Sequence, residues 1–313
     1  FANGYVELPD AQLGNGSITF STWLKPNSVS TLRSPIISTS QVNPGKYEYE
    51  GFYMALVNDK LEMYINDEFF SSEKVQDFTS APAQIDIVYE DENILLADKP
   101  QGLLSHPDEN EYNDTLITRI QKYLYLKGEY KPDEENSFKP SLANRIDRNT
   151  GGIVIAAKNA ESLRILCDKI KSREIDKRYL TIVHGVPKEK EALLQGFLQK
   201  NEEKNKVFLQ NKKTDENLSV KTYYKTIKSK NNLSLLEIEL LTGRTHQIRA
   251  HLSSIGHPLL GDGKYGKLKE DKKLGFNKQA LYSYKLRFDF ADNKGPLGYL
   301  CGKEFSIPKT SVW

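Results

Sequence analysis

The chain has 313 residues, more than one average domain needs, so we expect two domains or one large domain with an extension. Hydrophobic residues make up 38% and charged residues 27%, and the mean hydropathy is −0.58, which together exclude a membrane-embedded protein. The two cysteines, Cys167 and Cys301, are too few for a disulfide framework or a four-thiolate zinc site, and they favour a reducing compartment.

Charge is unevenly distributed along the chain. The formal net charge is only +2, but residues 1–82 carry 5 basic and 10 acidic side chains, whereas residues 83–313 carry 39 basic and 32 acidic ones. The two parts therefore have net charges of −5 and +7. The positive excess of the larger part favours binding to a polyanion such as a nucleic acid.

The first part, residues 1–82, has the pattern of an all-β segment. The chain starts at Phe1 and no charged segment with a long apolar run follows, so we expect a fragment edge or a processed end and no signal peptide. Short β-type runs are broken by Gly, Pro and Asn, and they cover residues 5–8, 17–24, 35–38, 52–57 and 61–65. Residues 81–83, Ala-Pro-Ala, are predicted to link this segment to the second part.

Three stretches of residues 1–66, GYVELPD, GSITFSTWLKPNS and GFYMALVNDKLEMYIND, resemble the concanavalin-like or laminin-G-like jelly roll of carbohydrate-binding modules. A jelly roll needs about eight strands, so the few runs present predict a truncated one. The alternative is a β-rich appendage without a ligand. Residues 61–76 could also be the last strand of an S4-type RNA-binding domain, and a junction between unrelated sequences near residues 57–76 is a further alternative.

The second part, residues 83–313, is predicted to be an α+β domain. Strands are expected over residues 85–89, 94–97, 153–157, 179–184 and 233–241. Helices are expected over residues 115–127 with Asp114 as N-cap, after the N-cap Asn159, and over residues 245–255 before Gly256. Cys167 falls on the apolar face of the second helix, where we interpret it as a core residue.

A polar loop between apolar stretches, residues 144–152 (NRIDRNTGG), places Asp147 between the guanidinium groups of Arg145 and Arg148. The arginines would keep Asp147 ionised and could also contact phosphates. The loop therefore combines a nucleophile or base with anion recognition. A structural salt bridge with a turn is the alternative interpretation.

A second cluster, LTGRTHQIRAH at residues 241–251, lies where a strand is expected to end and a helix to begin. The start of a helix presents free N–H groups and a positive dipole to an anion, and Arg244 comes just before it. His246 and Arg249 lie three residues apart, on one polar face of the expected helix. These side chains suit a phosphate or a carboxylate partner such as Asp147, and ordinary solvation of a helix is the alternative.

Three local patterns that could indicate a metal site, a dinucleotide-binding loop or a hydrolase triad are not supported by the neighbouring sequence. His246 and His251 are five residues apart and cannot share a metal as an i, i+4 pair would, so no metal site is expected. Residues 261–266 (GDGKYG) have dinucleotide-binding spacing without a preceding strand or a following helix, and we interpret them as a flexible loop. Ser105 and His106 lack the elbow and the third member of a hydrolase triad.

Four segments in the same order resemble the RluA family of RNA pseudouridine synthases: IVYEDENILLADKPQGLLSHP, NRIDRNTGGIVIAAK, KRYLTIVHG and LTGRTHQIRAHLSSIGHPLLGD. The resemblance covers about residues 85–313. It implies a pseudouridine synthase fold, in which a central, mainly antiparallel mixed sheet is flanked by helices and forms a cleft for RNA. It also implies an isomerisation of uridine to pseudouridine that needs no cofactor.

The resemblance assigns roles to particular residues. Asp147 matches the essential aspartate, Tyr179 the active-site tyrosine, and Arg244 the basic residue that pairs with the aspartate. Arg145 matches the arginine that takes the place of the extruded nucleotide, and the other expected RNA-binding residues are Arg148, His246 and Arg249. Two departures, Asn144 where the family usually has His and Gly151 where Ser is commoner, remove no charge, so we expect activity to persist.

We therefore expect a cytoplasmic, monomeric RNA pseudouridine synthase that acts on ribosomal or transfer RNA, without a metal, a nucleotide cofactor or a membrane. The flipped uracil would lie on the ring of Tyr179, while Asp147, kept charged by Arg244, assists cleavage of the glycosidic bond. Tyr179, or a water that it positions, would take the C5 proton. The alternative function is a carbohydrate-binding or adhesion module at residues 1–66 with an inactive synthase-like domain.

Overall fold

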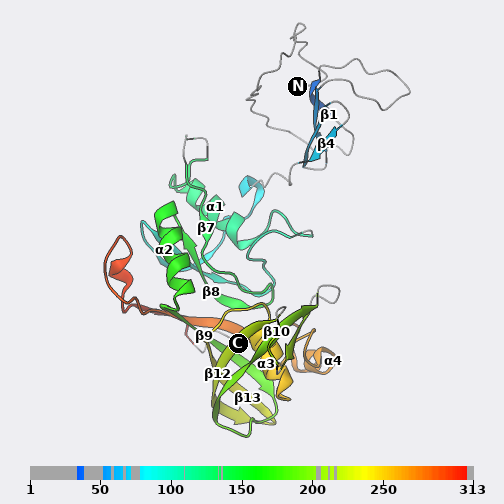
Figure 1. The fold of residues 1–313 in the computed structure, drawn as a ribbon, viewed down its shortest axis with the longest axis vertical. Helices are drawn as coiled ribbons and strands as arrows, with labels where there is room; N and C mark the ends of the chain where they lie inside the picture. The colour runs from blue at the N-terminus through cyan, green and yellow to red at the C-terminus, as the bar shows by residue number, and fades with distance from the viewer. Residues whose placement is uncertain are drawn as a thin grey trace, which may run out of the picture. The chain divides into compact units, whose positions relative to one another are not determined.

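The computed structural model describes residues 34–38, 52–57, 60–65, 68–71, 78–108, 110–132, 134, 137–201, 206–210, 212–214 and 217–308. The chain divides into two units, residues 1–76 and 77–313, which are described separately below (Figure 1). The strands expected at residues 5–8 and 17–24 lie outside the described residues.

The described strands of the first unit form one antiparallel sheet in the order β1-β2-β3-β4. Their bounds are β1 Ser34–Ser38, β2 Phe52–Val57, β3 Lys60–Ile65 and β4 Glu68–Ser71. The first three agree with the β-type runs of the sequence, whereas β4 was not expected. A jelly roll packs two sheets face to face, and these strands make one sheet, so they give the jelly-roll resemblance no support.

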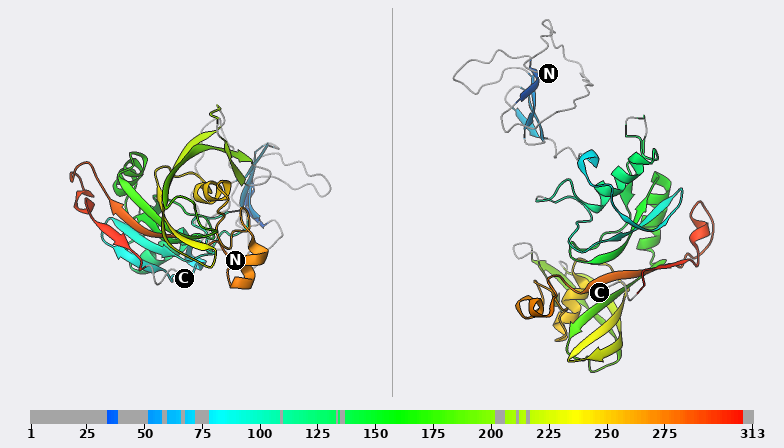
Figure 2. Two further views of the ribbon diagram at one scale, coloured as in Figure 1. Left: turned by 90° about the horizontal axis from the view of Figure 1, so that it is seen from below. Right: turned by 180° about the vertical axis from the view of Figure 1, so that it is seen from behind.

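The second unit has the α+β architecture that the sequence predicts. Its main sheet has the order β11-β10-β12-β13-β9-β14-β8-β6-β5, with β15 beside β14 and β7 beside β8. The pairing of β14 with β8 is parallel and the others are antiparallel. Strand β14, orange in Figure 2, runs between the region of α1, α2 and β8 and the region of β12, β13 and α3.

The elements of the second unit have the following bounds. The strands are β5 Asp86–Glu90, β6 Ile94–Lys99, β7 Ser141–Leu142, β8 Gly151–Ala157, β9 Ile175–His184, β10 Glu191–Asn201, β11 Lys206–Gln210, β12 Leu218–Lys230, β13 Leu233–Leu240, β14 Leu281–Phe288 and β15 Glu304–Ser306. The helices are α1 Leu116–Leu126, α2 Ala160–Lys171, α3 Gln247–Ser254 and α4 Leu268–Asp271, with short 3-10 turns at Phe78–Ser80, Lys272–Leu274 and Gly298–Leu300.

Both faces of β6 and β8 are covered, which explains their continuous apolar sequences. Alternate residues of the two strands, such as Leu95 and Val154, pack with α1 in one cluster. The residues between them, such as Leu96 and Ile155, pack with α2 in another. These two strands are therefore a rigid support for the loop that precedes β8.

The ends of the helices confirm one expected cap and correct another. Asn159 caps α2 by accepting a hydrogen bond from the Ser162 amide at 2.8 Å. The N-cap of α1 is Thr115 rather than Asp114, because Thr115 forms a capping box with Thr118 while Asp114 is bound to Arg119.

Cys167 was expected in the core of the second helix and is exposed instead. Its neighbour Leu166 is the fully buried hydrophobic residue of α2. Successive helix positions differ by about 100°, so the buried stripe centred on Leu166 leaves Cys167 at its solvent edge.

Gly152 provides a test of how closely β8 and β14 approach. It has a φ of +111°, and a Cβ atom built there would overlap the backbone carbonyl of Ser283 on β14. We expect Gly152→Ala to lower the free energy of unfolding by about 3 kcal/mol, since steric overlap is added to the cost of a left-handed alanine.

The matched control is Gly128→Ala, where φ is +76° and no atom lies within 4 Å of the added Cβ. That change should cost only about 1 kcal/mol, the backbone term alone. Chemical denaturation of both variants measures the difference, and equal losses would show that the β8–β14 approach does not limit the residue at position 152.

Candidate active site

A cleft of about 610 Å³ lies between the loop before β8, strand β9 and the start of α3. The structure brings all seven residues proposed from the sequence to its lining: Arg145, Asp147, Arg148, Tyr179, Arg244, His246 and Arg249. They come from positions up to about a hundred residues apart in the chain, and their convergence makes this cleft the candidate active site.

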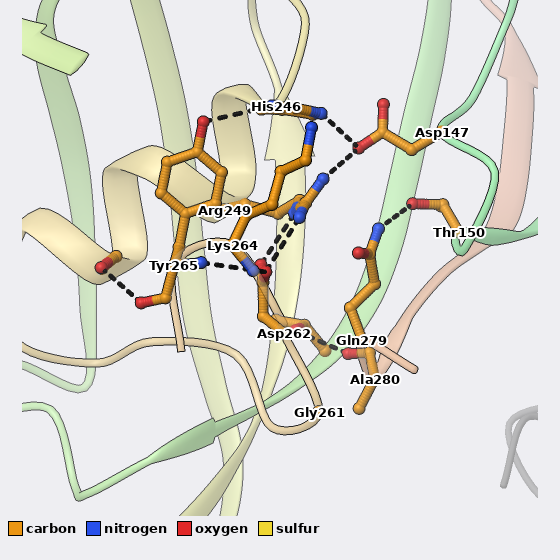
Figure 3. Close-up of polar contacts among 12 residues, drawn as sticks. Asp147, Thr150, His246, Arg249, Gly261, Asp262, Lys264, Tyr265, Gln279 and Ala280 are labelled. Carbon is orange, nitrogen blue, oxygen red and sulfur yellow. Dashed lines mark hydrogen bonds and ion pairs between the residues drawn. The ribbon is translucent and has the colours of Figure 1, made fainter. Parts of the chain in front are cut away.

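The central contact of the cleft is a shared arginine (Figure 3). Arg249 Nη1 donates to Asp147 Oδ2 at 3.0 Å, while Nε and Nη2 donate to the two oxygens of Asp262 at 2.7 and 2.8 Å. Burial lowers the pKa of Arg249, but the hydrogen bonds and charge of Asp262 and Asp147 outweigh it and raise the pKa above its usual value. The guanidinium therefore stays charged, with the edge formed by Nε and Nη2 bound to Asp262 and Nη1 bound to Asp147.

The expected partner of Asp147 is thereby corrected from Arg244 to Arg249. The helix begins at Gln247, two residues later than expected, and Gln247 Oε1 accepts a hydrogen bond from the Arg244 amide at 3.1 Å. Arg249 lies in the first turn of α3 with its side chain only 6% exposed, rather than on a solvated polar face. Arg244 lines the cleft, but it is Arg249 that reaches the carboxylate.

Asp262, which is not among the site residues predicted from the sequence, fixes the position of Arg249. Its side chain is fully buried, and Oδ1 also accepts the amides of Lys264 and Tyr265 at 2.8 and 3.1 Å. Although burial raises its pKa, Arg249 and these amides lower it below the usual range. The segment 261–266, expected to be a flexible loop, is a turn held around Asp262, and the signal in the sequence was a carboxylate between two glycines.

His246 completes the surroundings of Asp147. Its Nε2 lies 3.8 Å from Asp147 Oδ2, and its Nδ1 lies 3.1 Å from the hydroxyl of Tyr265. Burial lowers the pKa of His246 to about 4, so the imidazole is neutral near neutral pH. The hydroxyl oxygen of Tyr265 accepts a hydrogen bond from the Val207 amide at 2.8 Å, so the hydroxyl proton is available to be donated to Nδ1 of His246. The proton of the neutral imidazole then lies on Nε2, which faces Asp147.

Tyr179 presents its ring to the cleft from the middle of β9. The residue is 5% exposed and packs with Ile248 and Leu252 of α3. Burial raises the pKa of Tyr179 to about 12, against a lowering by its hydrogen bond with Ser283. The phenol is consequently neutral near neutral pH.

The loop that carries Asp147 is held by a lysine, Lys99, that is also not among the predicted site residues. Lys99, at the end of β6, is fully buried, and its Nζ donates to the carbonyls of Pro100, Leu103 and Arg148 at 3.1, 2.6 and 3.0 Å. Burial lowers the pKa of Lys99 to about 7. Its signal in the sequence was a charged residue directly after an apolar strand.

The two arginines of this loop, Arg145 and Arg148, differ in their contacts. Arg148 Nε donates to the carbonyl of Gly102 at 3.1 Å, so its side chain is partly used in holding the loop. Arg145 lines the cleft near His106, and its charge adds to the burial that lowers the pKa of that histidine.

Two further features concern cofactors and membranes. Within the described part of the chain, no group of three or more His, Cys, Asp or Glu side chains could hold a metal ion. Of the helices seen there, none is long and apolar enough to cross a membrane.

The buried ion pair of Arg249 and Asp262 allows a prediction of how the stability of the protein responds to Asp262→Asn. The change leaves Arg249 without its main counter-charge, so we expect the free energy of unfolding to fall by about 3 kcal/mol near neutral pH. Since the pKa of Asp262 is lower in the folded than in the unfolded protein, the stability it contributes is present above the unfolded pKa and disappears as the pH falls through the folded one. Denaturation curves at several pH values measure this difference.

The control is Asp289→Asn, which removes an exposed carboxylate bound to Arg287. An exposed ion pair contributes less than about 1 kcal/mol, so this variant should resemble the wild type. A difference between Asp262→Asn and wild type that stays constant into strong acid would contradict the assignment of the buried charge.

Comparisons with known proteins identify the family of the chain. Residues 93–254 match the RNA pseudouridylate synthase family. Ribosomal large subunit pseudouridine synthase D of Borreliella burgdorferi is 33% identical over 209 residues, which are 67% of this chain and 62% of that protein. An uncharacterized RNA pseudouridine synthase of Mycoplasma capricolum is 34% identical over 256 residues, 80% of this chain and 79% of that protein.

A solved structure shares the fold. Human RNA pseudouridylate synthase domain containing 1 superposes with a TM-score of 0.56 at 18% identity, over 76% of this chain and 86% of that one. The chain spans about two thirds of the length of the synthases D that it matches, 62% in Borreliella burgdorferi and 64% in Zymomonas mobilis. The matched family segment contains the Asp147 loop, β9 and Arg249, and it confirms the RluA-type resemblance: the chain belongs to the RNA pseudouridylate synthase family.

Proposed function

We propose that this chain converts uridine in RNA to pseudouridine. The observation that carries the proposal is a partly exposed carboxylate, Asp147, which is held in a cleft by a buried arginine and lies in the same cleft as a buried aromatic ring, that of Tyr179. A carboxylate can assist departure of a base from ribose, and an aromatic ring can stack on the flipped base. Neither role requires a metal or a nucleotide cofactor.

The contacts of Asp147 suggest which oxygen acts. Among the described residues, both Arg249 and His246 approach Oδ2, as Figure 3 shows. Oδ1 is then available to the ribose C1′ as the bond from C1′ to N1 breaks. The freed uracil rotates, C5 bonds to C1′, and the proton lost from C5 is balanced by the proton that N1 gains, so the reaction is an isomerisation.

The state of Tyr179 limits its part in that proton transfer. A phenol with a pKa of about 12 is ionised in fewer than about one molecule in 10⁴ near neutral pH. We therefore assign its ring to stacking, and its hydroxyl to orienting the water that accepts the C5 proton. Arg145 and Arg148 line the cleft where displaced RNA would lie.

The RNA is proposed to be ribosomal, because the relatives from Borreliella burgdorferi and Zymomonas mobilis are by name ribosomal large subunit synthases. Transfer RNA is the second candidate. We further propose a cytoplasmic monomer whose catalytic domain is residues 83–313, with residues 1–82 as a separate β-rich segment. The carbohydrate-binding alternative is not supported by the comparisons.

Asp147→Asn tests the chemistry directly. The variant keeps the size of the side chain but loses the nucleophilic charge, so we expect pseudouridine formation to fall by about 10⁴-fold or more while RNA binding persists. Tritium release from ribosomal and transfer RNA transcripts labelled at uridine C5 measures the reaction. Asp168→Asn, on the exposed side of α2, is the control, and turnover in Asp147→Asn equal to that control would exclude the mechanism.

Tyr179→Phe separates the ring from the hydroxyl. Stacking is retained, so KM should change by less than about threefold, whereas loss of the oriented water should lower kcat by about 10²-fold. Steady-state tritium release gives both constants. A wild-type kcat in this variant would remove the hydroxyl from proton transfer.

A further inference from the structure

Strand β9 sends a second side chain into the cleft beside Tyr179. Alternate residues of a strand point to the same face, and Lys177 and Tyr179 both line the cleft. Arg178, between them, points to the other face, where it binds Asp176 at 2.8 Å and Glu237 at 3.4 Å. The strand therefore places a lysine two residues from the catalytic tyrosine, on the substrate side.

The ammonium of Lys177 has no hydrogen bond or ion pair with any described residue. The neighbouring carboxylate, that of Asp176, is bound to Arg178 on the opposite face. Burial, and next the charge of Arg173, lower the pKa of Lys177 to about 8. The charge of Asp176 offsets only part of this lowering. A half-buried cation with no ion pair is unfavourable in the free protein, and an anion in the cleft would relieve that cost.

Arg173 adds a second cation of the same kind. It also lines the cleft, and its exposed side chain has no hydrogen bond or ion pair within the described part of the chain. It follows the C-cap of α2 with a φ of +68°, and the next amide, that of Glu174, donates back to Lys169 at 2.9 Å. This position in a helix C-terminus favours glycine, so an arginine here is held in a strained conformation.

We propose that Lys177 and Arg173 form an anion subsite of the cleft, which binds a backbone phosphate of the RNA near the target uridine. Arg249 is less suited to this purpose, because each of its three guanidinium nitrogens already donates to a carboxylate and its charge is compensated within the protein. A compact ammonium beside a planar guanidinium suits a phosphate, which offers several acceptor oxygens. The identity of the anion as RNA phosphate rests on the proposed function, whereas the subsite itself rests on two cleft-lining cations that have no hydrogen bond or ion pair with the described residues.

The test compares Lys177→Met, Lys177→Arg and Arg173→Gly with Lys294→Met, which removes an exposed lysine outside the cleft. Filter binding of an unmodified large-subunit ribosomal RNA transcript is measured between about 50 and 300 mM KCl. Lys177→Met and Arg173→Gly should each weaken binding about 5-fold to 10-fold and reduce the slope of log K against log salt by about 0.7 to 0.9. Lys177→Arg should retain both affinity and slope, as should Lys294→Met.

Thermal unfolding separates binding from structure. Arg173→Gly relieves the left-handed strain, and Lys177→Met removes a half-buried charge that has no ion pair, so neither should lower Tm although both weaken RNA binding. In turnover, the loss should appear in KM rather than in kcat. The proposal would be overturned if Lys177→Met and Arg173→Gly left RNA affinity and salt slope unchanged. It would also be overturned if their weaker binding came with a lower Tm and Lys177→Arg did not restore it.

The binding readout keeps this proposal separate from the isomerase activity. If the wild-type protein binds the transcript but releases no tritium, the proposed function fails, while the salt slopes of the variants still decide whether the subsite exists. If tritium is released equally well by all variants at low RNA concentration and the slopes are equal, the function stands and the subsite is excluded.

Discussion

The guanidinium of Arg249 carries one positive charge between two carboxylates, and these differ in how much water reaches them. Asp262 is fully buried and also accepts two backbone amides, whereas the side chain of Asp147 is 27% exposed in the cleft. Burying an arginine is costly unless it is paired and fully hydrogen-bonded, and Asp262 meets that requirement. Asp147 is therefore oriented by a cation whose own position does not depend on Asp147, and it keeps an oxygen available for chemistry.

This arrangement depends on three segments, of which the loop with Asp147 lies about a hundred residues before the other two. Helix α3 carries Arg249, the turn after it carries Asp262, and the loop before β8 carries Asp147. The turn with Asp262 is held in place because the amide of Gly261 donates to Asp271 at 2.7 Å. The loop with Asp147 is held by Lys99, whose Nζ donates to the carbonyl of Arg148. Arg249 and the Asp147 loop are thus held by Asp262 and Lys99, which do not line the cleft, so the charged groups are in place before a substrate binds.

The sequence predicts those parts of the molecule whose local pattern agrees with their environment. Strands β6 and β8 were readable because both faces are apolar, and α2 because Asn159 caps it. Strand β12 was missed because its buried face includes Thr222, so that polar residues occupy both faces and the alternation is weak. Cys167 was placed wrongly because a periodic pattern fixes the centre of a buried stripe better than its edges.

The same distinction applies to the site. Six of the seven cleft residues could be proposed because they occur in two polar segments, 144–152 and 241–251, next to apolar elements. Tyr179, in strand β9, was proposed only from the family resemblance, as was the choice of Arg244 over Arg249 as the partner of Asp147. Asp262 and Lys99 could not be identified, because their function is defined by partners that only the fold brings close.

A net charge of +7 over residues 83–313 indicates attraction to a polyanion but does not say which cations meet it. The structure separates them by their partners. Arg249 and Lys99 are surrounded by acceptors of the protein itself, so their charges organise the site and contribute little to holding RNA. Lys177 and Arg173 line the same cleft without such acceptors, and so their hydrogen-bond donors stay available to phosphate. In the proposed function, affinity and catalysis therefore rest on different cations, and a variant that loses one is expected to keep the other.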